Sequence, residues 1–181
     1  MKEKILAIFG IRGTGKSTLR NKMVALYPNS FYTMRQVTTR EIRENESKDE
    51  YDWLTPDEYF EMQDKLIATT MVNGNLYGTR TDNIDSKKIG ITIVDIDGLN
   101  DLLNFEDKYE IFSIGLFNDT EVTRKRNSDI CKYNENIEGY KNCKVLFLGS
   151  DEEPYIEPDV VMEELLSHEF VKLWNMSILL N

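Results

Sequence analysis

The sequence has few of the residues that build metal sites, disulfides and acid–base clusters. Its 181 residues include two cysteines and one histidine. Cys131 and Cys143 lack the spacing of zinc ligands, and we expect free thiols rather than a disulfide. The lone His168 lies in a predicted helix, where we expect it to be solvated. The sequence therefore gives no reason to expect a structural metal site or histidine-based catalysis.

The sequence also lacks long apolar runs and an excess of positive charge. Its apolar runs are no longer than strands, which predicts no membrane-spanning helix and no membrane partner. The N-terminal residues run directly into a glycine-rich loop, so we expect no removable signal peptide and a cytoplasmic protein. The net charge of −10 argues against a nucleic-acid partner, because general nucleic-acid binding depends on neutralising phosphates.

No internal repeat, Gly/Ser-rich linker or low-complexity block divides the chain, and its 40% of apolar residues suit the core of a single domain. Strand-like apolar stretches are residues 4–9, 30–34, 66–72, 91–97, 109–117 and 144–149, and helical patterns cover 17–26, 55–66 and the chain from Pro158 onward. This alternation of short apolar runs with helical patterns predicts an α/β domain with a mostly parallel central sheet.

The segments between these elements carry their own local patterns. The helix expected over residues 55–66 begins with Thr55 as N-cap, Pro56 at the first position and Glu58 three residues after the cap. Residues 37–50 are polar and predict an extended loop, and residues 73–75 predict a turn. In the C-terminal helix, the leucines with Phe170 and Trp174 are expected to cover the core.

The stretch FGIRGTGKSTL, at residues 9–19, follows the first predicted strand and opens the first predicted helix. Gly10, Gly15, Lys16 and Ser17 complete the pattern G-x-x-x-x-G-K-[ST]. In that pattern backbone N–H groups surround phosphate oxygens, the lysine reaches the β and γ phosphates, and the hydroxyl ligates Mg²⁺. The stretch predicts a nucleotide-binding loop, although the motif alone does not separate hydrolysis, switching and transfer.

Positive charge is concentrated near this loop. Residues 1–43 contain nine Lys or Arg and only two Glu, although the whole chain is acidic. A local positive field of this kind attracts a small polyanionic ligand. A chance excess of cations on one solvated helix face is the alternative interpretation.

Several stretches after the loop are more specific than the loop itself. In this order and at similar spacings, GTGKSTL, VTTREIR, YDW with the T-x-x-E-[YF] helix that follows, NGNLYGT and VDID resemble guanylate kinase. The resemblance runs from about residue 3 to about residue 98. It implies a P-loop nucleoside monophosphate kinase that uses ATP with Mg²⁺ and a (deoxy)nucleoside monophosphate, with GMP or dGMP as the favoured acceptor, and that works as a monomer or a homodimer.

The resemblance also implies a P-loop NTPase-type three-layer fold in one domain over residues 1–181. The core then covers about residues 1–35, 88–127 and 144–181. A small acceptor-binding insertion covers about residues 36–87, and a short lid covers about residues 124–143. Phosphoryl transfer in such a fold asks mainly for positioning and charge neutralisation, and the acceptor phosphate supplies the nucleophilic oxygen. Closure of the lid is expected to exclude water.

The resemblance assigns roles to individual residues. The ATP-binding residues would be Arg12, Gly13, Thr14, Gly15, Lys16, Ser17 and Thr18, with Ser17 and Asp95 at the metal. The acceptor-binding residues would be Gln36, Arg40, Arg43, Tyr51, Thr70, Tyr77, Thr79 and Asp97, and the catalytic ones Lys16, Arg40 and the lid residues Arg124 and Arg126. Guanidinium groups suit a phosphate acceptor because two parallel N–H groups bind two of its oxygens.

Several of these assignments have a structural alternative. Asp95 or Asp97 can instead cap the helix that follows the strand ending near them, and Tyr51 can belong to the core. The lid arginines can lie on a solvated helix face, and Arg43 can be an ordinary loop charge.

Two departures from guanylate kinases qualify the resemblance. Gln36 and Ala68 occupy the places where the family reads guanine with a serine and a glutamate. No arginine follows Arg126, and the connection from there to Lys144 is shorter than the usual lid region. The acceptor can therefore be another or a modified nucleoside monophosphate, or a different phosphorylated small molecule. A non-catalytic binding module is a further alternative, disfavoured by the complete phosphate loop, and no N-K-x-D motif supports a GTPase switch.

Overall fold

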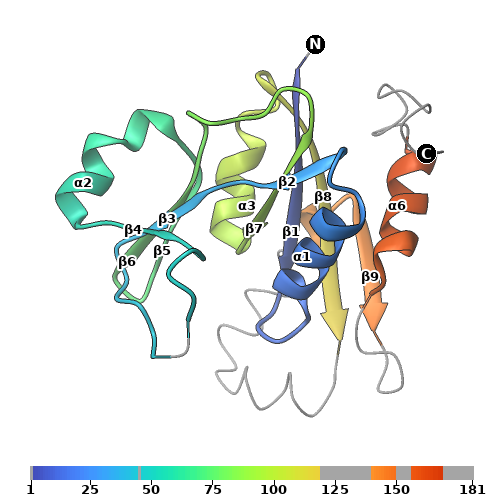
Figure 1. The fold of residues 1–181 in the computed structure, drawn as a ribbon, viewed down its shortest axis with the longest axis horizontal. Helices are drawn as coiled ribbons and strands as arrows, with labels where there is room; N and C mark the ends of the chain where they lie inside the picture. Colours follow the sequence, from blue (N-terminus) through green and yellow to red (C-terminus); the bar gives the residue numbers. More distant parts are fainter. Residues whose placement is uncertain (1, 45, 119–139, 150–155, 169–181) are drawn as a thin grey trace.

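A computed structural model describes residues 2–44, 46–118, 140–149 and 156–168 of the chain (Figure 1). Its larger sheet has the strand order β2–β7–β1–β8–β9, and all neighbouring strands in it are parallel. These strands are β1 (Glu3–Gly10), β2 (Phe31–Thr33), β7 (Ile89–Val94), β8 (Tyr109–Asn118) and β9 (Val145–Gly149). The predicted α/β class with a mostly parallel central sheet is confirmed.

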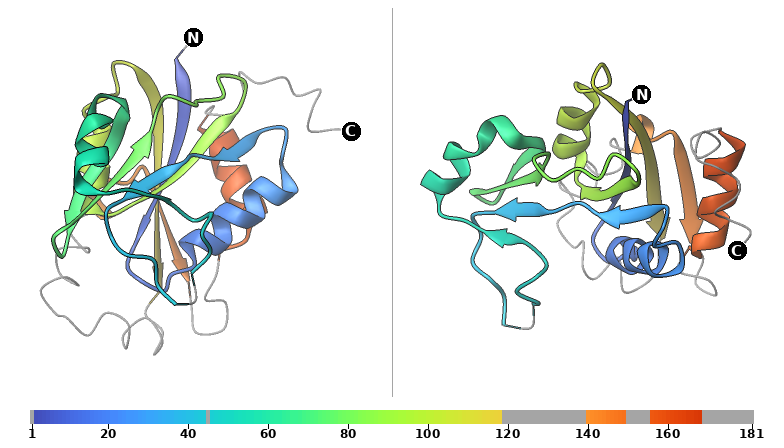
Figure 2. Two further views of the ribbon diagram at one scale, coloured as in Figure 1. Left: turned by 60° about the vertical axis from the view of Figure 1, so that its left-hand side comes forward. Right: turned by 45° about the horizontal axis from the view of Figure 1, so that its top comes forward.

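Helices cover both faces of this sheet, and the sequence of β1 shows why. Alternate side chains of a strand point to opposite faces, so a strand covered on both sides reads as a continuous apolar run. Leu6 and Ile8 pack in a core cluster with α1 and α6, whereas Ile5 and Phe9 pack in a second cluster with α3. The helices are α1 (Lys16–Leu26), α3 (Ile96–Leu103) and α6 (Pro158–Ser167). Figure 2 shows α1 and α3 on opposite sides of the sheet.

A smaller sheet with the strand order β4–β3–β6–β5 projects from the larger one, on the side away from α6 (Figures 1 and 2). It consists of β3 (Gln36–Thr38), β4 (Asp52–Trp53), β5 (Leu66–Val72) and β6 (Asn75–Arg80). Residues Val37, Tyr59 and Leu66 form its own buried cluster. The chain enters it from β2, the edge strand of the larger sheet, after two residues.

The helix predicted over residues 55–66 begins as expected and ends early. Thr55 and Glu58 form a complete capping box, with Pro56 at the first position of α2 (Pro56–Glu61). A 3₁₀ turn, η1 (Gln63–Lys65), follows directly. Leu66 is buried as the first residue of β5, opposite Arg80 on β6, and this pairing stops the helix before Leu66.

The strand predicted over residues 91–97 is also shorter at its end than expected. β7 ends at Val94, so the prediction that it runs to Asp97 was wrong. Asp95 instead is the N-cap of α3, and its Oδ1 accepts a hydrogen bond from the Gly98 N–H at 2.8 Å. A short acidic side chain before a helix competes well for these N–H groups, which explains the early end of the strand.

The C-terminal helix begins at Pro158 as predicted, but α6 ends at Ser167 with His168 as its C-cap, so the prediction that His168 lies inside the helix was wrong. His168 follows it and is exposed, with a ring nitrogen 2.8 Å from Glu164 Oε1. Cys131, Phe170 and Trp174 lie outside the described residues. Among the described helices, none is long and apolar enough to cross a membrane.

Candidate functional site

A cavity of about 660 Å³ opens where the smaller sheet meets the carboxyl ends of β1 and β7. Most of the predicted site residues line it, namely Arg12, Gly13, Gly15, Lys16, Ser17, Thr18, Gln36, Tyr51, Thr70, Tyr77, Asp95 and Asp97. Four others, Thr14, Arg40, Arg43 and Thr79, are not among the lining residues. Ligands of parallel α/β sheets bind at this edge, beyond the carboxyl ends of the strands.

One end of the cavity is the glycine-rich loop between β1 and α1. Gly13 and Gly15 have φ angles of 98° and 87°, in the left-handed region that glycine adopts without strain. Gly15 is also the N-cap of α1, whose first turn holds no acidic residue. The free N–H groups and the positive end of the helix dipole make such a helix start a binding place for anions.

Lys16 holds its ammonium group against the backbone of the same loop. Its Nζ donates to the carbonyl oxygens of Gly10 at 2.7 Å and Ile11 at 3.0 Å. Burial lowers the pKa of Lys16 to about 8, and the neighbouring charge of Asp95 opposes that shift. The Lys16 ammonium group therefore lies in the cavity, bound to carbonyl groups that a phosphate ligand can replace.

Asp95 is held between the two sheets. Its Oδ2 accepts a hydrogen bond from Thr70 Oγ1 at 3.1 Å, while its Oδ1 caps α3. The expectation that a carboxylate caps the next helix is confirmed for Asp95, and its place near Lys16 leaves the metal role open. Ser17 is exposed at the start of α1, also in the cavity.

No cluster of three or more His, Cys, Asp or Glu within the described ranges could hold a metal ion by itself. Mg²⁺ prefers oxygen ligands, and in nucleotide sites it takes one or two from protein and the rest from phosphates and water. The Ser17 hydroxyl and the Asp95 carboxylate are oxygen donors of this kind in the same cavity. The residues present therefore fit a magnesium ion that arrives with a phosphate ligand.

The loop after β3 leads to Tyr51, which lines the same cavity, whereas Arg40 in this loop does not line it. Two oxygens of Glu46 accept hydrogen bonds from Arg40 Nη2 at 2.7 and 2.9 Å, and Arg40 Nη1 donates to the Glu41 carbonyl at 2.7 Å. The Arg40 guanidinium also lies 5.1 Å from the centre of the Trp53 ring. The hydrogen bond to Glu46 raises the pKa of Arg40, and the same bond lowers the pKa of Glu46.

Two tyrosines stand between this loop and the cavity. The rings of Tyr51 and Tyr77 lie 6.2 Å apart, and both residues line the cavity. Burial raises the pKa of Tyr51, so its hydroxyl stays a hydrogen-bond donor at neutral pH. The Arg40 guanidinium lies 5.9 Å from the centre of the Tyr51 ring, so the loop cation is next to the tyrosine pair.

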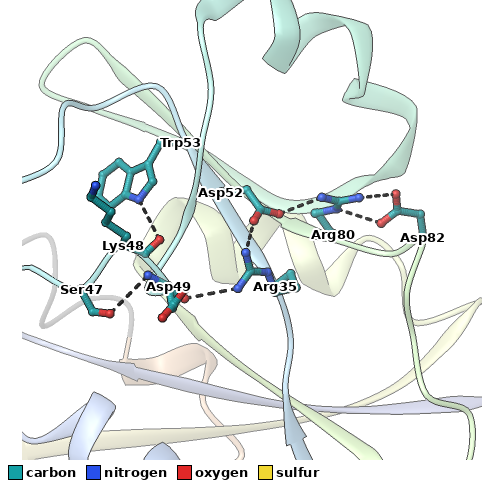
Figure 3. Close-up of polar contacts among 8 residues, drawn as sticks. All are labelled: Arg35, Ser47, Lys48, Asp49, Asp52, Trp53, Arg80 and Asp82. Atoms are coloured by element: carbon teal, nitrogen blue, oxygen red, sulfur yellow. Dashed lines mark hydrogen bonds and ion pairs between the residues drawn. The ribbon is translucent and has the colours of Figure 1, made fainter.

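An ion-pair network supports the segment that carries Tyr51 (Figure 3). Asp52 lies between Arg35 and Arg80 and accepts from Arg80 Nη1 at 2.8 Å, and Asp82 continues the chain on the far side of Arg80. Arg35 Nη1 also donates to the carbonyl of Asp49 at 3.3 Å. Burial works against ionisation of Asp52, but the hydrogen bonds from Arg80 and Arg35 outweigh it and lower the pKa of Asp52.

Two contacts that helices α1 and α3 make with segments of the smaller sheet and its loop were not predicted from the sequence. The buried Arg20 of α1 donates from Nη2 to Glu50 Oε1 at 3.2 Å, next to Tyr51 in the chain. Asp101 of α3 accepts from both the N–H and the hydroxyl of Thr69, at 2.8 and 3.0 Å. Partners about thirty residues apart carry no local sequence pattern that could have identified them.

The residues in the positions that read guanine in the family have unexpected surroundings. Gln36 Nε2 donates to the carbonyl of Ile93 at 2.8 Å. Ala68 is buried with a φ angle of 52°, at an irregularity in the pairing of β5 with β6. Thr79 is fully buried, and its hydroxyl shares a hydrogen bond of 2.7 Å with Thr92. The structure therefore does not bring the predicted acceptor residue Thr79 to the cavity.

The remaining predicted residues lie in the loop after β3, in the glycine-rich loop and outside the described residues. Arg43 is exposed, and its backbone N–H donates to Glu46 Oε2 at 3.2 Å. Thr14 is buried, with its hydroxyl on the Ile11 carbonyl at 3.0 Å. The lid arginines Arg124 and Arg126 lie outside the described residues.

Comparisons with known proteins give one family match and two structural similarities. A sequence model of the guanylate kinase family matches residues 2–134. The structure is similar to the crystal structure of guanylate kinase from Anaplasma phagocytophilum, with a TM-score of 0.68 and 17% identity over 98% of this chain and 89% of that one. It also matches shikimate kinase from Aquifex aeolicus, with a TM-score of 0.43 and 16% identity over 94% of this chain and 99% of that one.

At 17% identity the first structural similarity shows the fold, which is that of P-loop kinases. The sequence match spans most of the chain and includes the glycine-rich loop, the loop after β3 and both tyrosines of the cavity. The chain therefore belongs to the guanylate kinase family of nucleotide kinases.

Proposed function

We propose that the protein transfers the γ-phosphoryl group of ATP to a nucleoside monophosphate, with GMP or dGMP as the first candidate. One observation carries the proposal: a single cavity joins a complete phosphate loop to a tyrosine pair, and the Arg40 guanidinium lies 5.9 Å from the ring centre of Tyr51 in that pair. ATP bound at the phosphate loop and a monophosphate bound at the tyrosine pair would point their phosphates toward each other. The complete loop also disfavours a non-catalytic binding module, which has no use for Lys16.

The phosphate loop would hold the donor. The N–H groups at the start of α1 would bind the phosphates of ATP, as helix N-termini bind anions. Lys16 would exchange the carbonyls of Gly10 and Ile11 for phosphate oxygens, which form stronger hydrogen bonds with an ammonium group. Ser17 and Asp95 would hold Mg²⁺ bound with ATP, and that ion would supply charge neutralisation at the phosphates.

Arg40 would hold the acceptor phosphate. A guanidinium group binds a carboxylate and a phosphate with the same bidentate geometry. Both carboxylate oxygens of Glu46 accept from Arg40 Nη2, at 2.7 and 2.9 Å, so an arriving phosphate would compete with Glu46 for Arg40. Tyr51 and Tyr77 would complete the site by donating hydroxyl hydrogens to the same phosphate. Arg43, exposed beside them, would add a second cation.

The reaction needs few groups beyond these. A phosphate oxygen of the acceptor would form the new bond to the γ-phosphorus as the bond from that phosphorus to the leaving ADP oxygen breaks. The acceptor oxygen is already ionised at neutral pH, so no general base is required. His168, the one histidine of the chain, follows α6, where it contacts Glu164. Charge neutralisation by Lys16 and Arg40 would supply most of the rate increase.

The base end of the cavity would favour bases that donate hydrogen bonds. Gln36 uses its amide N–H on Ile93, and Thr70 uses its hydroxyl hydrogen on Asp95. Both residues then present acceptor oxygens, which suit ring N–H and amino groups. Guanine offers both kinds of donor, which keeps GMP or dGMP first. Ala68 supplies no carboxylate, so we propose weaker discrimination against other amino-bearing bases than a buried carboxylate would give.

A screen of monophosphates tests the proposal. ATP is combined with each common ribo- and deoxynucleoside monophosphate, ADP release is coupled to a spectroscopic readout, and Lys16→Ala serves as the control for contaminating kinases. We expect GMP or dGMP to have the highest kcat/KM, with another amino-bearing base less than a thousandfold behind. If kcat/KM for GMP or dGMP exceeds that of every other monophosphate by more than a thousandfold, the proposal of weak discrimination between bases is wrong. Failure of every monophosphate, with ATP still bound, would overturn the proposed acceptor class and favour another phosphorylated small molecule.

A further inference from the structure

One buried tyrosine contacts the phosphate loop from outside the motif. Tyr140 lies in the 3₁₀ turn η2 (Tyr140–Asn142) and is 9% exposed. Its hydroxyl accepts a hydrogen bond from the backbone N–H of Ile11 at 3.0 Å and donates one to the carbonyl of Leu116 at the end of β8. It therefore ties the first peptide of the loop to the neighbouring strand of the sheet.

The same peptide also holds Lys16. The N–H of Ile11 and the carbonyl of Gly10 belong to one planar peptide unit. Its N–H is on the Tyr140 hydroxyl at 3.0 Å, and its carbonyl oxygen accepts from Lys16 Nζ at 2.7 Å. Because the unit is rigid, a rotation that broke the first hydrogen bond would also misplace the second. The Tyr140 hydroxyl and the Lys16 ammonium are thus coupled through a single peptide plane.

The surroundings leave this arrangement little freedom. A Cβ atom added at Gly10 would lie 2.5 Å from the Leu116 carbonyl oxygen, and one added at Gly115 would lie 2.7 Å from the Tyr140 ring. Phe9 and Phe117 hold the ring edge-on, with ring centres 4.9 and 5.7 Å from it. The backbone of β1, the backbone of β8 and the tyrosine ring therefore fit together only because glycine occupies both positions.

We infer that Tyr140 is a positioning residue for the donor end of the site: its hydroxyl fixes the Gly10–Ile11 peptide, and that peptide fixes Lys16. The inference rests on the proposed function, because it assumes that the loop binds ATP. Tyr140 touches neither proposed substrate in this role. Its effect on the reaction passes through the peptide to the lysine that contacts the phosphates.

Tyr140→Phe is the direct test, because it removes one oxygen and keeps the ring between Phe9 and Phe117. Tyr59→Phe is a matched control: Tyr59 is 4% exposed and donates its hydroxyl hydrogen to the Tyr77 carbonyl at 2.8 Å, at the other end of the site. We expect Tyr140→Phe to weaken MgATP binding and to lower kcat by about tenfold together, as loss of a buried hydrogen bond would, with the acceptor KM within twofold. We expect Tyr59→Phe to lower the Tm similarly without weakening MgATP binding.

Calorimetric titration with MgATP alone separates the two proposals. If wild-type protein binds no MgATP, the proposed function is overturned, and the inference with it. If wild type binds and Tyr140→Phe binds equally well with unchanged kcat, only the inference is overturned, and Tyr140 has a structural role alone. Should Tyr140→Phe fail to fold, Gly115→Ala decides by the same measurements, because its methyl group displaces the Tyr140 ring. Unchanged MgATP affinity in folded Gly115→Ala would overturn the inference.

Discussion

The two ends of the cavity are held in place by different kinds of contact. At the donor end, Lys16 and Tyr140 bind to backbone groups, namely the carbonyls of Gly10, Ile11 and Leu116 and the N–H of Ile11. At the acceptor end, charged side chains bind to one another. Arg40 pairs with Glu46, Arg20 pairs with Glu50, and the network of Figure 3 holds the segment around Tyr51.

The difference decides how each end responds to its surroundings. Backbone contacts inside a core depend on the fold and are little affected by salt or acid. Partly exposed ion pairs contribute only about 0–1 kcal/mol each, are screened by salt and are lost when the carboxylate is protonated. We therefore expect the donor end to keep its shape as salt is added or the pH falls, and the acceptor end to vary under both changes.

The largest effect is expected from Lys16→Ala at the donor end. Loss of one preorganised contact to the transferring phosphoryl group lowers kcat by roughly 10²–10³. The matched control is Lys22→Ala on the same helix, where Lys22 pairs with Glu157 on the surface. Steady-state kinetics on both variants, with circular dichroism to verify folding, would check this. If Lys16→Ala keeps more than about a tenth of wild-type turnover, the catalytic interpretation of the loop is wrong.

Arg40→Ala should produce the next largest effect, confined to the acceptor. A charge-assisted contact to a phosphate is worth roughly 1.5–3 kcal/mol, so the acceptor KM should rise about 10–100-fold while the ATP KM stays near wild type. Arg43→Ala should raise the acceptor KM less, because Arg43 is exposed whereas Arg40 is only 13% exposed and lies against Trp53. An equal rise in the KM of ATP and the KM of the acceptor would show that Arg40 does not act on the acceptor alone.

The pH dependence of the donor end should follow Lys16. Burial lowers its pKa to about 8, so the charged form that binds phosphate is present below pH 8 and is lost as the pH rises. We expect kcat/KM for ATP to fall about tenfold per pH unit above that value, because this ratio reports the free enzyme. Lys16→Arg keeps its charge at these pH values and should show a flat profile. If wild type and Lys16→Arg lose kcat/KM with the same slope above pH 8, titration of Lys16 is not the cause of that loss.

The smallest effect is expected from Asp52→Asn at the acceptor end. The hydrogen bonds from the two arginines outweigh the effect of burial and hold the pKa of Asp52 below its usual value of 3.8. Its contribution to stability, about 1 kcal/mol for a partly exposed pair, is present above about pH 4 and disappears as the pH falls further. Urea unfolding should therefore separate the variant from wild type at pH 7 and not at pH 2. Asp82→Asn, which touches one arginine, should cost less.

Much of the fold was predictable because local patterns determine it. The central strands β1 and β7 are buried on both faces and read as short apolar runs, and the capping box at Thr55 marks the start of α2. Element ends were less predictable, since they depend on distant partners. Leu66 leaves the predicted helix because it pairs with Arg80 on β6, and Asp95 ends β7 because it caps α3.

The site divides in the same way. At the proposed donor end, the glycine-rich loop that lines the cavity was predicted as a contiguous motif, whereas the contact from Tyr140, far away in the chain, was not predicted. At the proposed acceptor end, Arg40, Tyr51 and Tyr77 were predicted together, and the structure brings the two tyrosines to the cavity. The salt bridge between Arg20 and Glu50 was not, because charges thirty residues apart form no periodic pattern.

Asp52 also determines how the smaller sheet is assembled. β4 consists of two residues, Asp52 and Trp53, paired with Val37 and Thr38 of β3, so its ladder hydrogen bonds alone define its alignment weakly. A shift of one residue would place Trp53 opposite Val37 and turn the carboxylate to the other face of the sheet, away from Arg35 and Arg80. The ion pairs of Asp52 with the two arginines therefore stabilise the native alignment of β4 over the shifted one. In strong acid the carboxylate is neutral, and the free-energy difference between the two alignments becomes smaller.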